Sequence, residues 1–196
     1  MSEFKVIVAT QDHLNYAGEI CLEMELSAKI RGTGIAKRTT DFISQKMIEG
    51  KAVIAFTNEG VWAGFCYIET WQSGEYVANS GLIISPAFRK KGLAKLIKNK
   101  IFDLSRTKFP NSKIFGLTTG LAVMKINSEL GYKPVTYSEL TSDKQFWNGC
   151  QSCVNYEILK SKDFKNCLCT AMLYNENISK QTIIKKSENE VKIDKY

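Results

Sequence analysis

A proline, a short basic run with one glycine and the start of a helix follow one another in residues 86–94, PAFRKKGLA. The first amides of a helix have no partner within it, and the helix dipole adds partial positive charge at the same end. Gly92 would let a ligand approach the backbone closely. The loop therefore suits an anion, and charge alone allows nucleic acid, an anionic membrane surface or the phosphates of a cofactor. It has neither the Gly-Lys-Ser/Thr signature of a Walker loop nor the three glycines of the dinucleotide fingerprint.

The positive charge of the chain is concentrated around this loop. The 196 residues carry a formal net charge of +7, and the segment from Arg89 to Lys113 holds nine Lys or Arg residues and one acid, Asp103. Such a patch indicates either a local anionic partner or a solvated helix face. The segment lacks interleaved aromatic residues, so a basic nucleic-acid-binding protein is the less favoured alternative.

Four of the six cysteines fall into two close pairs near the end of the chain. Cys150 and Cys153 form a C-x2-C pair, and Cys167 and Cys169 form a C-x-C pair after thirteen intervening residues. Four thiolates in two close pairs can satisfy a tetrahedral, structural zinc ion. Reduced, partly buried thiols and a structural or regulatory disulfide are the alternatives.

The elements that must position these residues follow from the spacing of apolar side chains. The predicted order is a strand, two helices, three strands, a helix, a strand, a helix and a final strand, with no internal repeat. In the helix after the loop, Leu93, Leu96 and Ile101 belong to one apolar stripe, and Lys98 is expected on a polar face. The predicted strands are residues 4–8, 52–56, 61–71, 76–84, 114–117 and 132–137, and the predicted helices are residues 11–29, about 40–49, 93–104 and 121–130.

The strand, the proline turn and the glycine loop together resemble the acyl-CoA motif of the GCN5-related N-acetyltransferases, the GNAT superfamily. That motif is Val/Ile-x-Pro and then Arg/Gln-x-x-Gly-x-Gly/Ala at a helix start; the chain has Ile84-Ser85-Pro86 and Arg89-Lys90-Lys91-Gly92-Leu93-Ala94. Glu129-Leu130-Gly131-Tyr132 falls where the family has Lys-Leu-Gly-Phe. The resemblance covers residues 4–138 and implies the GNAT fold, an α/β (α+β) architecture with a mixed central sheet between layers of helices.

The resemblance implies an acyl-CoA-dependent N-acetyltransferase with acetyl-CoA as the donor. The loop amides would bind the CoA diphosphate, with the basic side chains near its phosphates. The edge of the preceding strand would hydrogen-bond the pantetheine and polarise the thioester, because this strand and the next one splay apart in the family. The residues implied in cofactor binding are Leu82, Ile83, Ile84, Arg89, Lys90, Lys91, Gly92, Leu93 and Ala94.

In this family the acceptor amine attacks the thioester directly. The tyrosine that often protonates the leaving thiolate corresponds to Asn127 here. This departure leaves three alternatives: a hydrogen bond from Asn127, proton donation by Tyr137, or unassisted departure of the thiolate. The glutamate that some members carry on the motif strand maps near Ala78, so Glu69 or Glu75 is expected as a base, acting directly or through water.

Arg31, Lys37 and Arg38 make the connection between the first two helices basic. Cations there suggest an acceptor that bears a carboxylate, such as an amino acid, with glutamate as one case. The expected partner is a small-molecule amine, without membrane or nucleic acid, and a homodimer is allowed. The missing tyrosine and glutamate leave a second interpretation, a catalytically inactive CoA-binding regulatory protein.

The sequence predicts an acyl-CoA-binding domain over residues 1–138, a cysteine-rich extension packed on it over residues 139–178, and a flexible polar tail over residues 179–196. No run approaches the roughly 18 apolar residues of a membrane span. The first ten residues also lack the pattern of a secretory signal. A cytoplasmic protein with reduced cysteines is therefore expected.

Overall fold

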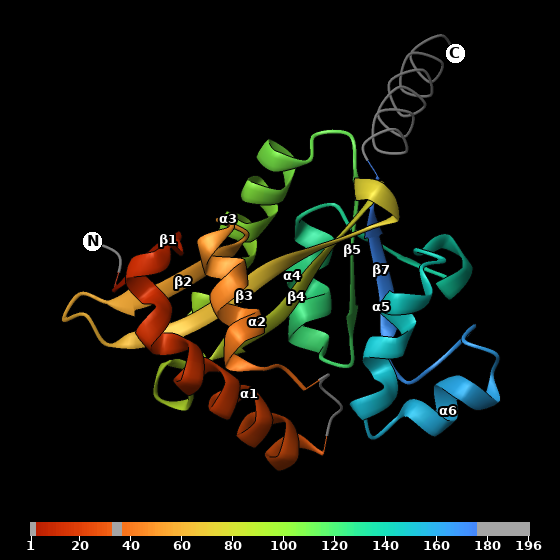
Figure 1. The fold of residues 1–196 in the computed structure, drawn as a ribbon, viewed down its shortest axis with the longest axis horizontal. Coiled ribbons are helices and arrows are strands. Elements are labelled where there is room, and N and C mark those ends of the chain that lie inside the picture. The colour runs from red at the N-terminus through yellow and green to blue at the C-terminus, as the bar shows by residue number, and fades with distance from the viewer. Residues whose placement is uncertain (1–2, 33–36, 176–196) are drawn as a thin grey trace, which may run out of the picture.

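The computed structural model describes residues 3–32 and 37–175, and the predicted tail lies outside these residues (Figure 1). The helices and strands are β1 (Phe4–Val8), α1 (Ala17–Arg31), α2 (Thr40–Ile48), β2 (Ala52–Thr57), β3 (Trp62–Trp71), β4 (Tyr76–Ile84), α3 (Leu93–Lys108), β5 (Lys113–Thr118), α4 (Leu121–Glu129), β6 (Lys133–Val135), α5 (Lys144–Asn148), α6 (Tyr156–Ser161) and β7 (Thr170–Tyr174). Short 3-10 turns precede α1 (Gln11–Tyr16), join β3 to β4 (Gln72–Gly74) and follow β4 (Pro86–Phe88).

One seven-stranded sheet runs through the molecule in the order β1-β2-β3-β4-β5-β7-β6. The β4–β5 pair is parallel and every other pair is antiparallel, so the sheet is mixed. Helices α1 and α2 cover one face, and α3 and α4 cover the other (Figure 1). The predicted α/β fold, a mixed sheet between two layers of helices, is confirmed.

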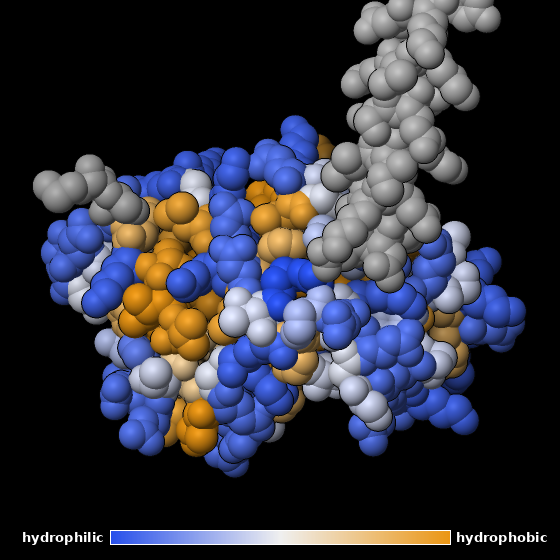
Figure 2. All heavy atoms as spheres, turned by 90° about the horizontal axis from the view of Figure 1, so that it is seen from above, coloured by the Kyte–Doolittle hydropathy of each residue, from blue (hydrophilic) through white to orange (hydrophobic). Residues whose placement is uncertain are grey.

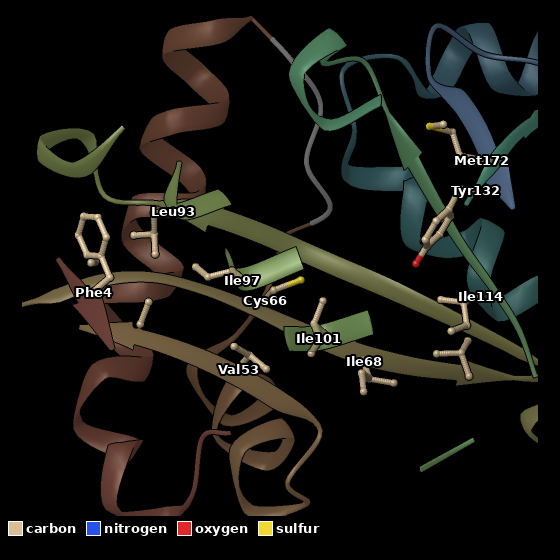
Figure 3. Close-up of a cluster of buried hydrophobic side chains, with 13 residues drawn as sticks. Phe4, Val53, Cys66, Ile68, Leu93, Ile97, Ile101, Ile114, Tyr132 and Met172 are labelled. Atoms are coloured by element: carbon tan, nitrogen blue, oxygen red, sulfur yellow. The ribbon is translucent and has the colours of Figure 1, made fainter. Parts of the chain in front are cut away.

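The core consists of apolar clusters on the two faces of the sheet. Between the sheet and α3, Leu93, Ile97 and Ile101 pack on residues of β2 and β3 such as Val53 and Cys66 (Figure 3). All six residues of β2 are buried, as expected of a central strand covered on both faces. Each buried Ile, Leu or Val side chain contributes about 1.5–3 kcal/mol through the hydrophobic effect.

Two side chains of α3 lie differently from the prediction. Lys98 is only 2% exposed, not on a polar face, and its ammonium lies 5.3 Å from the centroid of the Tyr132 ring. Leu96, predicted in the apolar stripe, is 40% exposed. The long aliphatic stem of lysine can pack like an apolar side chain, and the aromatic face attracts the cation. Helical spacing alone therefore misassigned the edge of the buried stripe.

The sheet continues beyond residue 138, where the sequence predicts the end of the acyl-CoA-binding domain. Strand β7 pairs antiparallel with both β5 and β6 and lies between them. The cysteine-rich segment, residues 139–169, is thus a long connection within the fold and not an appended extension. It does pack on the sheet, through a cluster that includes Leu140 and Leu159. The strand predicted as the final one, β6, has only three residues.

The surface seen in Figure 2 is mostly polar, and its largest apolar patch lies in the left half of the view. No described helix combines the length and apolar character that crossing a membrane requires. Nothing in the described residues bears on the predicted homodimer, which stays a prediction.

Candidate functional site

The predicted cofactor loop lies between the end of β4 and the start of α3. Pro86 opens a 3-10 turn, and Gly92 takes left-handed backbone angles (φ +79°) at the N-cap of α3, where no side chain caps the helix. The amides of the first turn therefore face the loop without a side-chain acceptor. Apart from its chain neighbours, no described residue places an atom within 4 Å of where a Cβ on Gly92 would stand. This is the geometry of an anion site at a helix N-terminus.

The three cations of the loop differ in what they contact. The Arg89 guanidinium turns toward α1 and donates to Glu23 Oε1 at 3.0 Å, while its Nε donates to the Ile84 carbonyl at 3.1 Å. Lys90 is exposed, and Lys91 forms an exposed ion pair with the N-terminal segment. Arg89 and Lys91 thus already have protein partners, whereas Lys90 is exposed.

Strands β4 and β5 separate soon after they meet. Residues 76–78 pair in parallel with residues 113–115, and among the described residues the rest of β4 has no partner on β5. On its other edge, β4 stays paired with β3 but shifts register, with Tyr67 opposite Ser80 and Phe65 opposite Ile83. Gly81 lies at this irregularity with φ +64°. The edge of residues 82–84 that β5 leaves uncovered can accept an extended ligand, the role that the sequence assigns to this segment, although the Ile84 carbonyl already accepts from Arg89.

Asn127, the candidate hydrogen-bond donor, lies on α4 and is 1% exposed. Its Nδ2 lies 3.7 Å from Met172 Sδ on β7, a weak interaction. Its Oδ1 is buried and has no hydrogen-bond partner among the described residues. Buried polar atoms are normally paired, so an unpaired amide beside β7 leaves hydrogen-bonding capacity for a ligand.

Tyr137 and Asn127 lie on opposite faces of the sheet. The Tyr137 hydroxyl donates to the Cys169 carbonyl at 2.8 Å, and its ring stacks on Trp147 at 5.4 Å. Tyr137 belongs to the apolar cluster under the cysteine-rich segment, whereas Met172, the contact of Asn127, belongs to the cluster under α3. The structure therefore does not bring the two candidate acids together.

The two candidate bases are also separated. Glu69 pairs across the sheet with Ala78, the last β4 residue that meets β5, and its side chain is 12% exposed. Glu75 lies at the β3–β4 turn, is 53% exposed and forms an ion pair with Lys113 at 3.0 Å. Glu69 is thus the carboxylate beside the point where the strands part.

A cluster of Arg38, Tyr67 and Glu69 adjoins this point. The Arg38 Nε donates to the Tyr67 hydroxyl, and one terminal nitrogen of Arg38 lies 3.7 Å from Glu69 Oε2. The guanidinium also lies against the rings of Phe42 and Tyr67. Burial raises the pKa of Tyr67, so its hydroxyl stays protonated. At 3.7 Å the two charges are close but not hydrogen-bonded, which leaves both able to bind a ligand.

The other two predicted acceptor cations are placed differently. Arg31 lies in the last turn of α1 and is exposed. Lys37 is exposed, and its backbone amide donates to Ser152 Oγ at 2.9 Å. This bond joins the α1–α2 connection to the cysteine-rich segment. Only Arg38 of the three reaches the cluster with Glu69.

The four C-terminal cysteines surround one cavity of about 30 Å³, together with Leu117, Tyr137, Trp147, Asn155, Tyr156 and Leu159. All four are free thiols. Two of them interact with the backbone of Asn155, whose amide donates to Cys153 Sγ at 3.4 Å and whose carbonyl lies 3.7 Å from Cys167 Sγ. Among the described residues, no three His, Cys, Asp or Glu side chains are placed to hold a metal ion. The described residues thus give no support to the predicted zinc site, and the four thiols are free and partly buried.

Burial makes these thiols poor acids. Burial, followed by the neighbouring cysteines, raises the pKa of Cys150 to about 11 and that of Cys169 to about 12 from an ordinary 9.0. Above pH 9 the unfolded chain loses these protons while the native chain keeps them, so unfolding becomes more favourable as pH rises toward 11. We expect the reduced protein to lose thermal stability between about pH 9 and pH 11, and a Cys150→Ala/Cys169→Ala variant to lose less. Equal losses in melting curves of both proteins would refute this origin.

Tyr67 and Glu23 were missed by sequence reasoning. Tyr67 reads as an ordinary inward-facing residue of a strand, and Glu23 as one of several acids on α1. Their partners, Arg38 and Arg89, lie far away in sequence. The alternation of β3 places Tyr67 and Glu69 on one face, and this was the only available signal.

No family model matches the chain. A curated relative, thialysine N-epsilon-acetyltransferase from Caenorhabditis elegans, is 31% identical over 114 residues, which are 55% of this chain and 69% of the relative. The match covers more than two thirds of the relative at an identity that indicates common descent.

Solved structures share the fold. N-acetylglutamate synthase from Neisseria gonorrhoeae, complexed with coenzyme A and N-acetyl-glutamate, matches 88% of this chain with a TM-score of 0.61 and 14% identity. The chain spans only 35% of that synthase. A GNAT superfamily phosphinothricin acetyltransferase from Sinorhizobium meliloti, in complex with acetyl-CoA, matches 88% of each chain with a TM-score of 0.59 and 12% identity.

Proposed function

The chain belongs to the GCN5-related N-acetyltransferase (GNAT) superfamily of acetyl-CoA-dependent enzymes, and we propose that its acceptor is the amine of a small molecule that also bears a carboxylate, such as an amino acid. The cluster of Arg38, Tyr67 and Glu69 beside the β4–β5 opening carries this proposal. It offers one cation, one hydroxyl and one carboxylate, all of them largely buried. The C. elegans relative is named for an amino acid, thialysine, and the Neisseria synthase for an N-acetylated amino acid, which supports the same class.

The donor side of the proposal rests on the loop and the free strand edge. The first amides of α3 and the exposed Lys90 would hold the phosphates of acetyl-CoA. The unpaired edge of residues 82–84 would hydrogen-bond the pantetheine. Asn127 would donate from its amide to the sulfur or accept from the bound donor, which would satisfy its buried Oδ1. The residues present therefore fit acetyl-CoA.

On the acceptor side, Arg38 and the Tyr67 hydroxyl would bind the carboxylate, and Glu69 would hold the ammonium and take its proton. The neutral nitrogen then attacks the acetyl carbonyl carbon, the new C–N bond forms and the C–S bond breaks. CoA leaves as a thiolate that Asn127 can stabilise by a hydrogen bond, and the thiolate takes up the proton that the new amide nitrogen loses. Tyr137 has no part in this scheme, because its hydroxyl already donates to a carbonyl.

Replacement of Arg38 tests the acceptor assignment. We expect Arg38→Gln to raise KM for an amino-acid acceptor about tenfold to a hundredfold, because a charged hydrogen bond to the carboxylate is lost. The same variant should leave KM for the corresponding decarboxylated amine nearly unchanged. Steady-state release of free thiol from acetyl-CoA, with lysine and cadaverine as a matched pair, measures both.

Lys37→Gln is the control, since it removes a neighbouring exposed cation. It should leave both acceptors unaffected. If Arg38→Gln slows both acceptors equally, or if Lys37→Gln reproduces its effect, Arg38 does not bind the carboxylate and the acceptor proposal fails.

A further inference from the structure

Arg89 belongs to the cofactor motif in sequence, yet its side chain joins three other parts of the protein. One terminal nitrogen donates to Glu23 Oε1 at 3.0 Å and also to Ser27 Oγ, both on α1. The Nε donates to the carbonyl of Ile84, the last residue of β4, at 3.1 Å. The guanidinium thus links its own loop to the end of β4 and to the middle of α1.

The partners of Arg89 are well shielded from solvent. Ser27 is 1% exposed, and the Glu23 side chain is 17% exposed. Ser27 donates in turn to the Glu23 carboxylate, so that carboxylate accepts from two donors. A shielded, charge-assisted network of this kind is geometrically specific and costly to disrupt.

The same network argues against a phosphate-binding role for the Arg89 side chain. Glu23 neutralises the guanidinium, and three protein acceptors bind its Nε and one terminal nitrogen. Turning the guanidinium fully toward a diphosphate would break this pair and would leave a partly buried carboxylate uncompensated. Lys90, by contrast, is exposed in the same loop.

Helix α1 leads directly to the acceptor side of the molecule. It ends at Arg31, and the connection that follows it carries Arg38, the residue that contacts Tyr67 and Glu69. Because α1, α2 and Tyr67 pack in one apolar cluster, a shift of α1 relative to β4 would displace Tyr67 and its partner Arg38 relative to the strand edge where the thioester is expected. Displacements of about 1 Å between reacting groups can cost about a hundredfold in rate.

We propose that Arg89 is a positioning residue that fixes α1 to the end of β4 through Glu23, and so couples occupancy of the cofactor loop to the geometry of the acceptor site. The acceptor part rests on the function proposed above; the coupling of α1 to the loop does not. Glu23 is the second positioning residue of this network.

Four variants separate positioning from phosphate binding: Arg89→Gln, Glu23→Gln, the double variant, and Lys90→Gln as the exposed control. Arg89→Gln and Glu23→Gln should each lower kcat about tenfold, and the double variant should be no worse than either, because both changes break one interaction. Acetyl-CoA affinity by calorimetry should change less than about threefold in these variants. Lys90→Gln should instead weaken acetyl-CoA binding and reduce its salt dependence.

Hydrogen exchange of α1 provides a readout that needs no acceptor. In the wild type, acetyl-CoA should slow exchange of the amides of α1 about tenfold, and Arg89→Gln and Glu23→Gln should abolish this protection. Arg89→Lys, which keeps the charge, should retain part of it even if the glutamine variant folds poorly. Protection of α1 that survives in Glu23→Gln, or Arg89→Gln weakening acetyl-CoA binding tenfold while Glu23→Gln does not, would overturn the proposal. Failure of every acceptor with the protection intact would instead refute the proposed function alone.

Discussion

Gly92→Trp is expected to weaken acetyl-CoA binding by about a hundredfold or more while the protein stays folded. The indole would stand at the open side of the loop, where the first amides of α3 face an anion. Few protein atoms would resist it, because no described residue other than its chain neighbours comes within 4 Å of the place where the new Cβ would stand. The left-handed backbone (φ +79°) would cost a residue with a Cβ about 1–2 kcal/mol. Calorimetric titration with acetyl-CoA measures the effect.

Gly74→Trp is the matched control for this variant. Gly74 also has a positive φ (+90°) and open space around it, but it lies in the turn between β3 and β4, away from the cofactor loop. It should share the cost of backbone strain and bind acetyl-CoA as the wild type does. Unchanged affinity in Gly92→Trp, or an equal loss in Gly74→Trp, would show that the loop is not the site.

Gly81→Ala is expected to destabilise the protein by about 2–5 kcal/mol, since a methyl group must fit a left-handed backbone and an occupied space. Its Cβ would stand 2.2 Å from Tyr67 Cε1 and 3.0 Å from Met24 Cε, and φ there is +64°. The Tyr67 ring must move, and the hydroxyl that contacts Arg38 moves with it. The melting temperature should fall by about 5–15 °C, and the acceptor KM of the folded fraction should rise.

Gly74→Ala separates the two causes of this loss. It introduces the same methyl group at a positive φ (+90°) without a neighbour within 4 Å. It should cost only about 1–2 kcal/mol and leave the acceptor KM unchanged. If both variants melt at the same temperature, the close approach of Gly81 to Tyr67 is not the cause of the loss of stability.

The strands and helices that could be predicted are those whose signal is local. β1 and β4 have the predicted bounds, 4–8 and 76–84, because β-branched residues and turn residues mark them directly. The position of Gly92 at the start of α3 could also be predicted, since proline, glycine and an amphipathic run follow one another in the sequence. The fold class followed from the order of these elements.

Features that depend on distant segments could not be predicted. β7 is a short strand at the end of a cysteine-rich segment, and its place between β5 and β6 is decided by pairing across the sheet. The spacing of the four cysteines allowed a zinc site to be predicted. It could not show that two of the thiols contact the backbone of Asn155, because those contacts depend on how the segment folds. Nor did the motif reveal the partner of Arg89, since Glu23 lies 66 residues away.

The role of Arg38 was anticipated from charge alone, but its geometry was not. In the sequence, nothing distinguishes Arg31, Lys37 and Arg38 as candidate acceptor-binding cations. Their side-chain contacts in the fold distinguish them. The side chain of Arg38 reaches Tyr67 and Glu69 across the start of α2, whereas the other two are exposed. Which cation faces a site depends on the path of the backbone between two helices, and composition does not determine that path.

The decisive experiment is to identify by mass spectrometry what the purified protein acetylates when acetyl-CoA is supplied with amino acids and with the amines that remain when their carboxylates are removed. We predict that an amino acid gains one acetyl group on nitrogen, with one CoA released for each acetyl transferred, and that its decarboxylated counterpart reacts much more slowly. Transfer to the decarboxylated amines at an equal or higher rate, or release of CoA with free acetate as the sole product, would contradict the proposed function.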